Sequence, residues 1–287
     1  MFDWYQHIPS HIDPVAIAIG SFSVRWYGLS YLTGLIVVLG LLLWRIKKGE
    51  SDHLLAENKN FGNQALKKKL ADVTFDLILV VFFAALIGGR LGYVIFYNPA
   101  FFFAHPLAIV SPYDSASGLL IGIYGMSYHG ALLGALFGGW AYAKRRKLDF
   151  LRWADFLVSA LPLGYFFGRI GNFLNGELYG RATYSPLGMY FVNDPKVLRH
   201  PSQLYEAVLE GLVIFCVLWL LRNGTQKPGL LLNLYIILYA CARIIAEQWR
   251  QPDPQLGFLM FGLTMGQLLS ILMFLVGAIF FFKVRKK

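Results

Sequence analysis

The sequence has 287 residues, of which 57% are hydrophobic and only 15% are charged, and its formal net charge is +10. Soluble domains average about 25% charged residues, so this composition excludes an ordinary soluble domain and predicts an integral membrane protein. The basic residues lie in short runs between apolar segments, which is typical of topology signals and argues against a nucleic-acid partner.

The apolar segments are each about 20 residues long, which is the length of a helix that crosses ~30 Å of hydrocarbon. They predict an all-α, polytopic protein with a single membrane domain over residues 1–287. In chain order, the seven expected transmembrane helices are 18–44, 73–98, 118–143, 153–175, 203–221, 230–249 and 263–282.

The lysines and arginines between these helices predict the orientation. With the N-terminus outside, eighteen of them fall on the inner side and only four on the outer side. The positive-inside rule therefore predicts an extracytoplasmic N-terminus and a cytoplasmic C-terminus. Residues 176–202 would then form a small extracytoplasmic cap.

Ionisable side chains within the expected spans cost about 2.5–3.5 kcal/mol each on insertion scales, so they are functional candidates by default. In chain order they include Arg25, Arg90, His129, Arg169, Glu206, Glu210, Arg243 and Glu247. At about 1.5 Å per helical residue, His129 falls near the midplane and most of the others fall in the outer half. We expect one polar cavity that opens toward the outer leaflet and carries an excess of arginine.

An arginine-rich cavity suits an anionic phosphate group, because guanidinium holds phosphate with two parallel hydrogen bonds. A structural alternative is that Arg243 and Glu247, four residues apart, only neutralise each other on one helix face. His129 likewise has two interpretations: it is a packing residue, or it is a general base with a near-neutral pKa.

The most specific motif is Gly168-Arg169-Ile170-Gly171-Asn172-Phe173-Leu174-Asn175-Gly176-Glu177-Leu178-Tyr179-Gly180, which fits G-R-x-G-N-F-x-N-x-E-x-x-G. Further matching segments are 26–28, 88–93, the residues around His129, 199–206, 239–247, 250–253 and 264–267. Through these motifs, nearly the whole chain resembles the prolipoprotein diacylglyceryl transferase family. Two departures are Ala131, where many relatives have a second glycine, and an outer 176–202 segment that is shorter than in some relatives.

The resemblance implies a bacterial plasma-membrane enzyme with two substrates. Such an enzyme transfers the sn-1,2-diacylglyceryl group of phosphatidylglycerol to the lipobox cysteine thiol of a prolipoprotein. A thioether forms and glycerol 1-phosphate leaves, which is the first step of lipoprotein maturation. The resemblance implies no cofactor and no metal, since both reacting partners arrive as substrates.

Site residues carry over position by position. The resemblance implies that His129, Arg169 and Arg243 are catalytic. It implies that the residues that bind or shape the substrate site are Tyr27, Arg90, Asn172, Glu177, Gly180, Tyr239 and Glu247. Arg169 and Arg243 would stabilise charge on the phosphate. Thiol activation stays open between His129 as base and the field of the arginines.

Two rival functions come from other classes. An arginine-lined transporter of anionic lipid or small anions would need polar residues in the inner half of the membrane, and the expected spans have almost none. A phosphatidyl-transfer enzyme would usually need clustered aspartates for a divalent metal, and no D-x-x-D cluster lies within the spans.

Overall fold

The computed structural model describes residues 3–19, 22–55, 62–96, 99–110, 126–224, 227–252 and 257–286. It divides into two compact units. The first unit comprises Met1–Lys48 and Ala154–Lys287, and the second comprises Gly49–Trp153. The boundary between the units falls within helix α6 (Phe150–Val158).

Helices make up most of the first unit. They are α1 (Asp3–Gln6), α2 (Trp26–Lys48), α7 (Leu161–Leu174), α8 (Ser202–Glu206), α9 (Ile214–Leu221), α10 (Leu230–Ala246) and α11 (Met265–Lys286). A π-helical segment, η4 (Ala207–Val213), joins α8 to α9, and short 3-10 turns lie at η1 (Ile8–His11) and η5 (Met260–Gly262). The second unit contains η2 (Asp52–Leu54), α3 (Asn63–Phe96), α4 (Pro99–Ala104), η3 (Pro106–Ile109) and α5 (Tyr128–Arg145).

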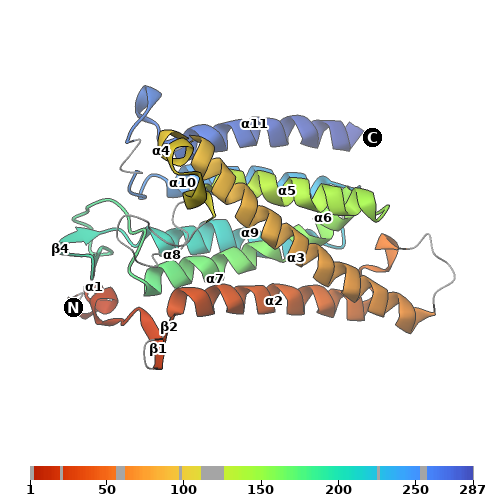
Figure 1. Ribbon diagram of the computed structural model, residues 1–287, viewed down its shortest axis with the longest axis horizontal. Coiled ribbons are helices and arrows are strands. Elements are labelled where there is room, and N and C mark those ends of the chain that lie inside the picture. Colours follow the sequence, from red (N-terminus) through yellow and green to blue (C-terminus); the bar gives the residue numbers. More distant parts are fainter. Residues whose placement is uncertain are drawn as a thin grey trace. The chain divides into compact units, whose positions relative to one another are not determined.

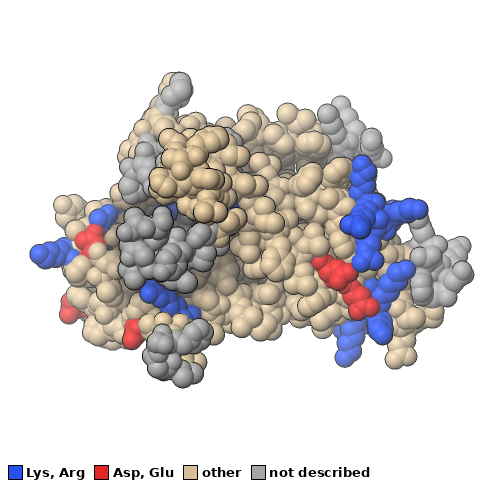
Figure 2. All heavy atoms as spheres, viewed as in Figure 1, with Lys and Arg blue, Asp and Glu red and all other residues tan. Residues whose placement is uncertain are grey.

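The predicted helical membrane protein is confirmed in its main features. Among the residues that the structure describes, four helices are long and apolar enough to cross a membrane: Trp26–Lys48, Asn63–Ile95, Ser202–Leu221 and Met265–Phe282. Helix α10 is a shorter apolar helix. Uncharged side chains also predominate along the helices on the face drawn in Figure 2. These features fit a multi-pass membrane protein, and the full count of seven spans stays a prediction.

Two antiparallel hairpins accompany the helices, and the all-α prediction lacked both. Strands β1 (Val15–Ile19) and β2 (Phe22–Arg25) form one, and β3 (Met189–Phe191) and β4 (Asp194–Arg199) form the other. The first expected span was wrong at its start for this reason, because Ala18 and Ile19 belong to β1, residues 22–25 form β2 and the helix begins at Trp26. Arg25 therefore ends a strand and is exposed.

The expected span 153–175 is two helices rather than one. Helix α6 ends at Val158 and α7 begins at Leu161, with Pro162 in its first turn. Proline is tolerated there because the first helical N–H groups have no partner within the helix. The Ser159 hydroxyl donates to the Phe156 carbonyl oxygen at 2.7 Å, which satisfies one backbone group at the break. Of the expected span 118–143, residues 118–125 lie outside the described residues.

Small residues let α7 lie close against its neighbours in the first unit, where α2 and α7 run side by side (Figure 1). A Cβ on Gly34 of α2 would lie 3.0 Å from the Gly164 carbonyl oxygen, and one on Gly171 would lie 2.9 Å from the Ser30 Cβ. On another side of α7, a Cβ on Gly211 of η4 would lie 2.7 Å from the Phe166 Cβ. Helix α7 is therefore held between α2 and the π-helical segment, which fixes the position of its polar side chains.

The segment 176–202 is folded against the N-terminal residues of the same unit. Phe173, Met189 and Phe191 are buried in one apolar cluster, and Tyr5 and Ile8 pack against it. The Tyr5 hydroxyl also donates to the Leu187 carbonyl oxygen at 3.3 Å. This segment thus forms a compact layer with the N-terminal residues.

Helices α3 and α5 of the second unit meet backbone to backbone. A Cβ on Gly130 or Gly134 of α5 would overlap carbonyl oxygens of α3, those of Gly88 and Ala84 respectively. Both helices carry glycines four residues apart, at Gly88 and Gly92 and at Gly130 and Gly134, which is the small-residue pattern of close helix packing in membranes. The glycine after His129 therefore has a packing role.

Candidate functional site

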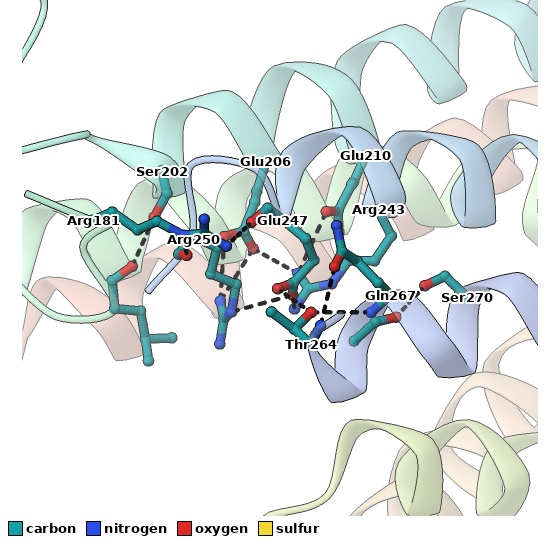
Figure 3. A network of polar contacts seen from close by, with 12 residues as sticks. Arg181, Ser202, Glu206, Glu210, Arg243, Glu247, Arg250, Thr264, Gln267 and Ser270 are labelled. Carbon is teal, nitrogen blue, oxygen red and sulfur yellow. Dashed lines mark hydrogen bonds and ion pairs between the residues drawn. The ribbon is translucent and has the colours of Figure 1, made fainter. Parts of the chain in front are cut away.

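Three arginines and three glutamates form one polar cluster within the first unit, and Figure 3 labels all of them except Arg169. We call it the Arg–Glu cluster; its members are Arg169, Glu206, Glu210, Arg243, Glu247 and Arg250. They come from α7, from α8 and η4, and from α10 with the four residues after it. Their formal charges balance, so the excess of arginine expected from the sequence is not found within this cluster.

Glu206 is the centre of the cluster. Its carboxylate receives Arg169 Nη2 at 2.8 Å, Arg243 Nη1 at 3.0 Å and Arg250 Nη1 at 3.2 Å. Glu206 has no exposed side-chain surface. One fully buried carboxylate thus draws three guanidinium groups together.

Tyr165 and Glu210 complete the environment of Arg169. Arg169 Nε donates to the Tyr165 hydroxyl at 2.8 Å, and that hydroxyl donates to Glu210 Oε2 at 2.5 Å. Glu210 also receives Arg243 Nη1 at 3.4 Å. The hydroxyl therefore links one arginine to the second buried carboxylate.

Glu247 contacts the other two arginines of the cluster, Arg243 and Arg250. Its Oε1 atom receives Arg243 Nη2 at 2.7 Å and lies 3.6 Å from Arg250 Nε. Arg243 and Glu247 do pair at i,i+4, as the structural alternative required, but Arg243 also reaches two carboxylates from another segment. Neutralisation within one helix is therefore only part of the role of this pair.

Glu206 and Glu210 lie four residues apart, a spacing that places side chains on the same helix face, and η4 begins between them. A π-helical turn has i→i+5 hydrogen bonds and is wider than an α-helical turn, and such turns are frequent at functional sites. Both carboxylates reach Arg243 Nη1 across this turn. Gly211 at the same turn permits the close approach to α7, because a side chain there would meet the Phe166 backbone.

The arginines keep a solvent-accessible edge, whereas the carboxylates do not. Side-chain exposure is 14% for Arg169 and Arg243 and 15% for Arg250, against 0% for Glu206 and Glu210 and 3% for Glu247. Buried carboxylates thus hold the guanidinium groups from behind and orient them. An anion would meet the arginines at these exposed edges, and preorganised donors of this kind stabilise developing negative charge.

Asn172 and Glu177 extend this arrangement along α7. Arg169 Nη1 donates to Asn172 Oδ1 at 3.2 Å, and Asn172 Nδ2 donates to Glu177 Oε1 at 2.8 Å. Gln203 Nε2 donates to the Glu177 carbonyl oxygen at 2.6 Å. Of the residues expected from the sequence, Arg169, Asn172 and Glu177 are thereby brought together in one hydrogen-bonded chain.

Gly180 lies where the 176–202 segment returns to the cluster. Its N–H donates to the His200 carbonyl oxygen at 2.8 Å, and it forms an isolated bridge with Arg250. A Cβ on Gly180 would lie 2.9 Å from the His200 Cβ and would overlap the Trp249 carbonyl oxygen. Close packing explains a glycine here without any contact to substrate.

The two tyrosines expected in the site differ in burial. Tyr239 is buried at 2% exposure, and its ring meets that of Tyr165 edge to face at 6.0 Å. Tyr27 is 38% exposed near the start of α2, and its ring lies 4.7 Å from that of Tyr31. Tyr239 therefore packs beside the residue that holds Arg169, whereas Tyr27 keeps an accessible ring.

Arg90 and His129 belong to the second unit. Arg90 donates from Nε to the Ile109 carbonyl oxygen at 2.8 Å and from Nη2 to that of Ala108 at 2.5 Å. Its guanidinium also lies 4.9 Å from the centre of the Phe102 ring. His129 lies in the first turn of α5, and its side chain is outside the described part of the structure.

Sequence reasoning missed two residues of the site. Tyr165 gave no signal, because a tyrosine in an apolar span is ordinary and its position four residues before Arg169 was not weighed. Arg250 belongs to the matching segment 250–253 but was not among the expected site residues, although its i,i+3 spacing from Glu247 predicts contact on a continued helical turn.

Comparison with known proteins shows the family of the chain. The family model described as "Prolipoprotein diacylglyceryl transferase" matches residues 14–283. A protein of Chlorobaculum tepidum named "Phosphatidylglycerol--prolipoprotein diacylglyceryl transferase" is 43% identical over 277 residues, which cover 96% of this chain and 90% of that protein. A protein of Desulfotalea psychrophila with the same name is 41% identical over 290 residues, covering 99% and 97% of the two chains. The chain belongs to the prolipoprotein diacylglyceryl transferase family.

Proposed function

We propose that this chain transfers the sn-1,2-diacylglyceryl group from phosphatidylglycerol to the lipobox cysteine of a prolipoprotein. The sulfur forms a thioether with the glyceryl carbon, the bond from that carbon to the phosphate oxygen breaks, and glycerol 1-phosphate leaves. Family membership over nearly the full chain supports this function. The single structural observation that carries it is the Arg–Glu cluster with its accessible guanidinium edges.

The leaving group explains why two arginines are needed. A phosphodiester carries one negative charge, and the departing phosphate monoester gains a second as the carbon–oxygen bond breaks. Arg169 and Arg243 share Glu206 Oε2, at 2.8 and 3.0 Å, so their guanidinium groups lie close enough to act on one phosphate. Asn172, Glu177 and Glu247 would orient these arginines, and Tyr27 and Tyr239 would line the site that holds the headgroup.

We place the reaction at the outer leaflet. The basic residues predict that the N-terminus lies outside the cytoplasm and the C-terminus inside, with seven spans and 176–202 as an extracytoplasmic cap. The acceptor cysteine emerges on the same side after export. A membrane-impermeant thiol reagent should therefore label a cysteine introduced at position 188 in intact cells but not one at position 147, and the opposite pattern would invert this orientation.

The function has a direct assay. Purified protein, vesicles that contain phosphatidylglycerol and a lipobox peptide should release glycerol phosphate, and the peptide should gain a diacylglyceryl group by mass spectrometry. The matched control is the same peptide with serine in place of cysteine, which should give no release. Glycerol phosphate release without peptide modification would indicate a lipid hydrolase and contradict the proposal.

Thiol activation is assigned to His129. The free thiol has a pKa of about 8.5, so only a small fraction is ionised at neutral pH. If His129 removes the proton, His129→Gln should lose most of its kcat/KM at pH 7 and recover part of it toward pH 9, where the thiol ionises without help. His105→Gln, which changes an exposed histidine of the same unit, is the control. An equal loss at every pH would pass thiol activation to the arginine field.

A further inference from the structure

Helix α11 of the first unit begins with a capping box. Thr264 precedes the helix, and its backbone N–H donates to Gln267 Oε1 at 3.0 Å, while the Gln267 N–H donates to Thr264 Oγ1 at 3.2 Å. This reciprocal pair satisfies N–H groups that a helix start leaves without partners within the helix. The segment 264–267 was part of the family resemblance, and the mechanism above gives it no role.

The Thr264 hydroxyl also reaches the Arg–Glu cluster. Its Oγ1 accepts from Gln267 through a lone pair, so its own hydrogen is available, and it donates to Glu247 Oε2 at 2.9 Å (Figure 3). Thr264 is 3% exposed, as is Glu247. One hydroxyl thus joins the start of a helix to a carboxylate of the cluster.

The two oxygens of Glu247 have different partners. Oε2 accepts from Thr264, while Oε1 receives Arg243 Nη2 at 2.7 Å and lies 3.6 Å from Arg250 Nε. Fixing Oε2 therefore fixes the direction from which Oε1 meets Arg243. A carboxylate that lost this contact could rotate about its last side-chain bond.

Gly266 holds the same carboxylate by leaving space for it. A Cβ at Gly266 would overlap Glu247 Oε1 and lie 2.8 Å from its Cδ. The carboxylate therefore rests against the first turn of α11, where the helix dipole favours negative charge. Two residues of one turn constrain Glu247 by independent means, one through a hydrogen bond and one through the absence of a side chain.

From these contacts we infer that Thr264 and Gly266 are positioning residues for the transfer reaction, acting on Arg243 through Glu247. Neither touches the substrate. Their role rests on the proposed function, because the group that they orient is the arginine assigned to the phosphate. The start of α11 is thereby a part of the active-site architecture as well as a helix cap.

The test compares variants that separate the cap from the carboxylate contact. Thr264→Val removes the hydroxyl contact with Glu247 and the acceptor for the Gln267 N–H. Gln267→Met removes the acceptor for the Thr264 N–H but leaves the Thr264 hydroxyl on Glu247. Thr264→Ser keeps every hydrogen bond, and Gly266→Ala displaces the carboxylate but keeps the cap. Ser270→Ala changes the next turn of α11, where the hydroxyl donates to the Gly266 carbonyl oxygen at 2.7 Å.

Losing a hydrogen bond to a charged group should lower kcat for glycerol phosphate release by about 10- to 100-fold in Thr264→Val. Gly266→Ala should show a similar loss. Thr264→Ser, Gln267→Met and Ser270→Ala should stay within about threefold of the wild type, because their Glu247 contact is intact. The KM for phosphatidylglycerol, measured in vesicles of fixed composition, should change less than kcat in every variant.

Two results would overturn the inference. One is near-normal kcat in Thr264→Val, and the other is an equal loss in Thr264→Val and Gln267→Met that follows a common fall in thermal stability. The second result would show that Thr264 acts only as a helix cap. Failure of the proposed function is a separate outcome, since it would show as no peptide-dependent release by the wild-type protein.

Discussion

Glycines bring helices close together in both units of this chain, and the first unit adds a buried network of arginines and glutamates that joins three helical segments. In the first unit, α7, η4 and α10 meet through the Arg–Glu cluster, where three guanidinium groups surround buried carboxylates. In the second unit, α3 and α5 meet through glycines, and the contact is between backbones. The expected motif residues fall in both regions; those of the first include Arg169, Arg243 and Glu247, which join one buried network.

A position in an apolar helix can hold a residue other than leucine or valine for two reasons. A glycine that opposes a backbone is needed for packing, so its replacement costs stability. A charged residue in a buried network is held by partners, and losing one partner leaves an uncompensated charge that costs about 3–5 kcal/mol. Activity and stability should therefore respond differently in the two units, and the following predictions test that difference in order of decreasing effect.

The largest effect is expected at Arg243. Arg243→Ala should lower kcat/KM at least about 100-fold, and Arg243→Lys should be nearly as damaging, because lysine keeps the charge but not the two-pronged hydrogen bonding. Glycerol phosphate release measures the loss. The control is Arg199→Lys, which alters an arginine paired with Asp194 at 2.6 Å outside the cluster. Near-normal turnover of Arg243→Lys would mean that charge alone suffices.

A smaller loss is expected at Tyr165. Tyr165→Phe keeps the ring but removes the hydroxyl that links Arg169 to Glu210, so kcat/KM should fall about 10-fold. Tyr142→Phe is the matched control in the second unit, since it removes a hydroxyl that donates to Asp76 at 3.1 Å. Equal activity losses in the two variants would break the distinction between the units.

The glycine contact should respond in stability. Gly134→Ala places a methyl group against α3, and overpacking of this kind costs about 1–3 kcal/mol, so the thermal midpoint in detergent should fall. Gly139→Ala in the same helix is the control, because its Cβ would lie 3.4 Å from the nearest atom, an ordinary contact. If both alanine variants had the same midpoint, the backbone contact would not limit stability.

The smallest effect is a pH dependence at His200, outside the helices. Partial burial lowers the pKa of His200 below its usual 6.5. The unfolded chain then takes up a proton more readily than the folded chain, so this group's stabilising contribution is present above pH 6.5 and is lost as pH falls through the folded pKa. The thermal midpoint of His200→Gln should therefore gain on that of the wild type as pH falls from 7 to 5. A constant difference would remove His200 from the pH response.

Much of the fold could be predicted because the apolar composition and length of a segment identify a membrane helix. Apolar runs of about 20 residues predicted where α2, α3, α10 and α11 lie, and most ends of these helices fall within a few residues of the predicted ends. The β1–β2 hairpin could not be predicted in this way, because Val15–Ile19 is itself apolar and merges with the run that follows. The break between α6 and α7 could not be predicted for the same reason, because it lies within one apolar run.

The candidate site was predictable as a list of residues but not as a network. The motif around Arg169 and the cost of charge in a span pointed to Arg169, Arg243 and Glu247. The balance of charge could not be foreseen, because Arg250 lies beyond the expected helix and joins Glu206 only through the fold. Tyr165 became part of the site only because η4 brings Glu210 to its hydroxyl.

The sequence by itself determined that this protein is a helical membrane protein, which family it resembles and which residue types carry the chemistry. It did so because hydrophobic length, charge cost and motif spacing are local properties of the chain. Only the tertiary structure decided which oxygen faces which nitrogen, that the carboxylates lie behind the arginines, and that the first turn of α11 holds Glu247. Those contacts join residues far apart in sequence, as with Arg169 and Glu206 or Glu247 and Thr264, and their geometry follows from how the helices pack.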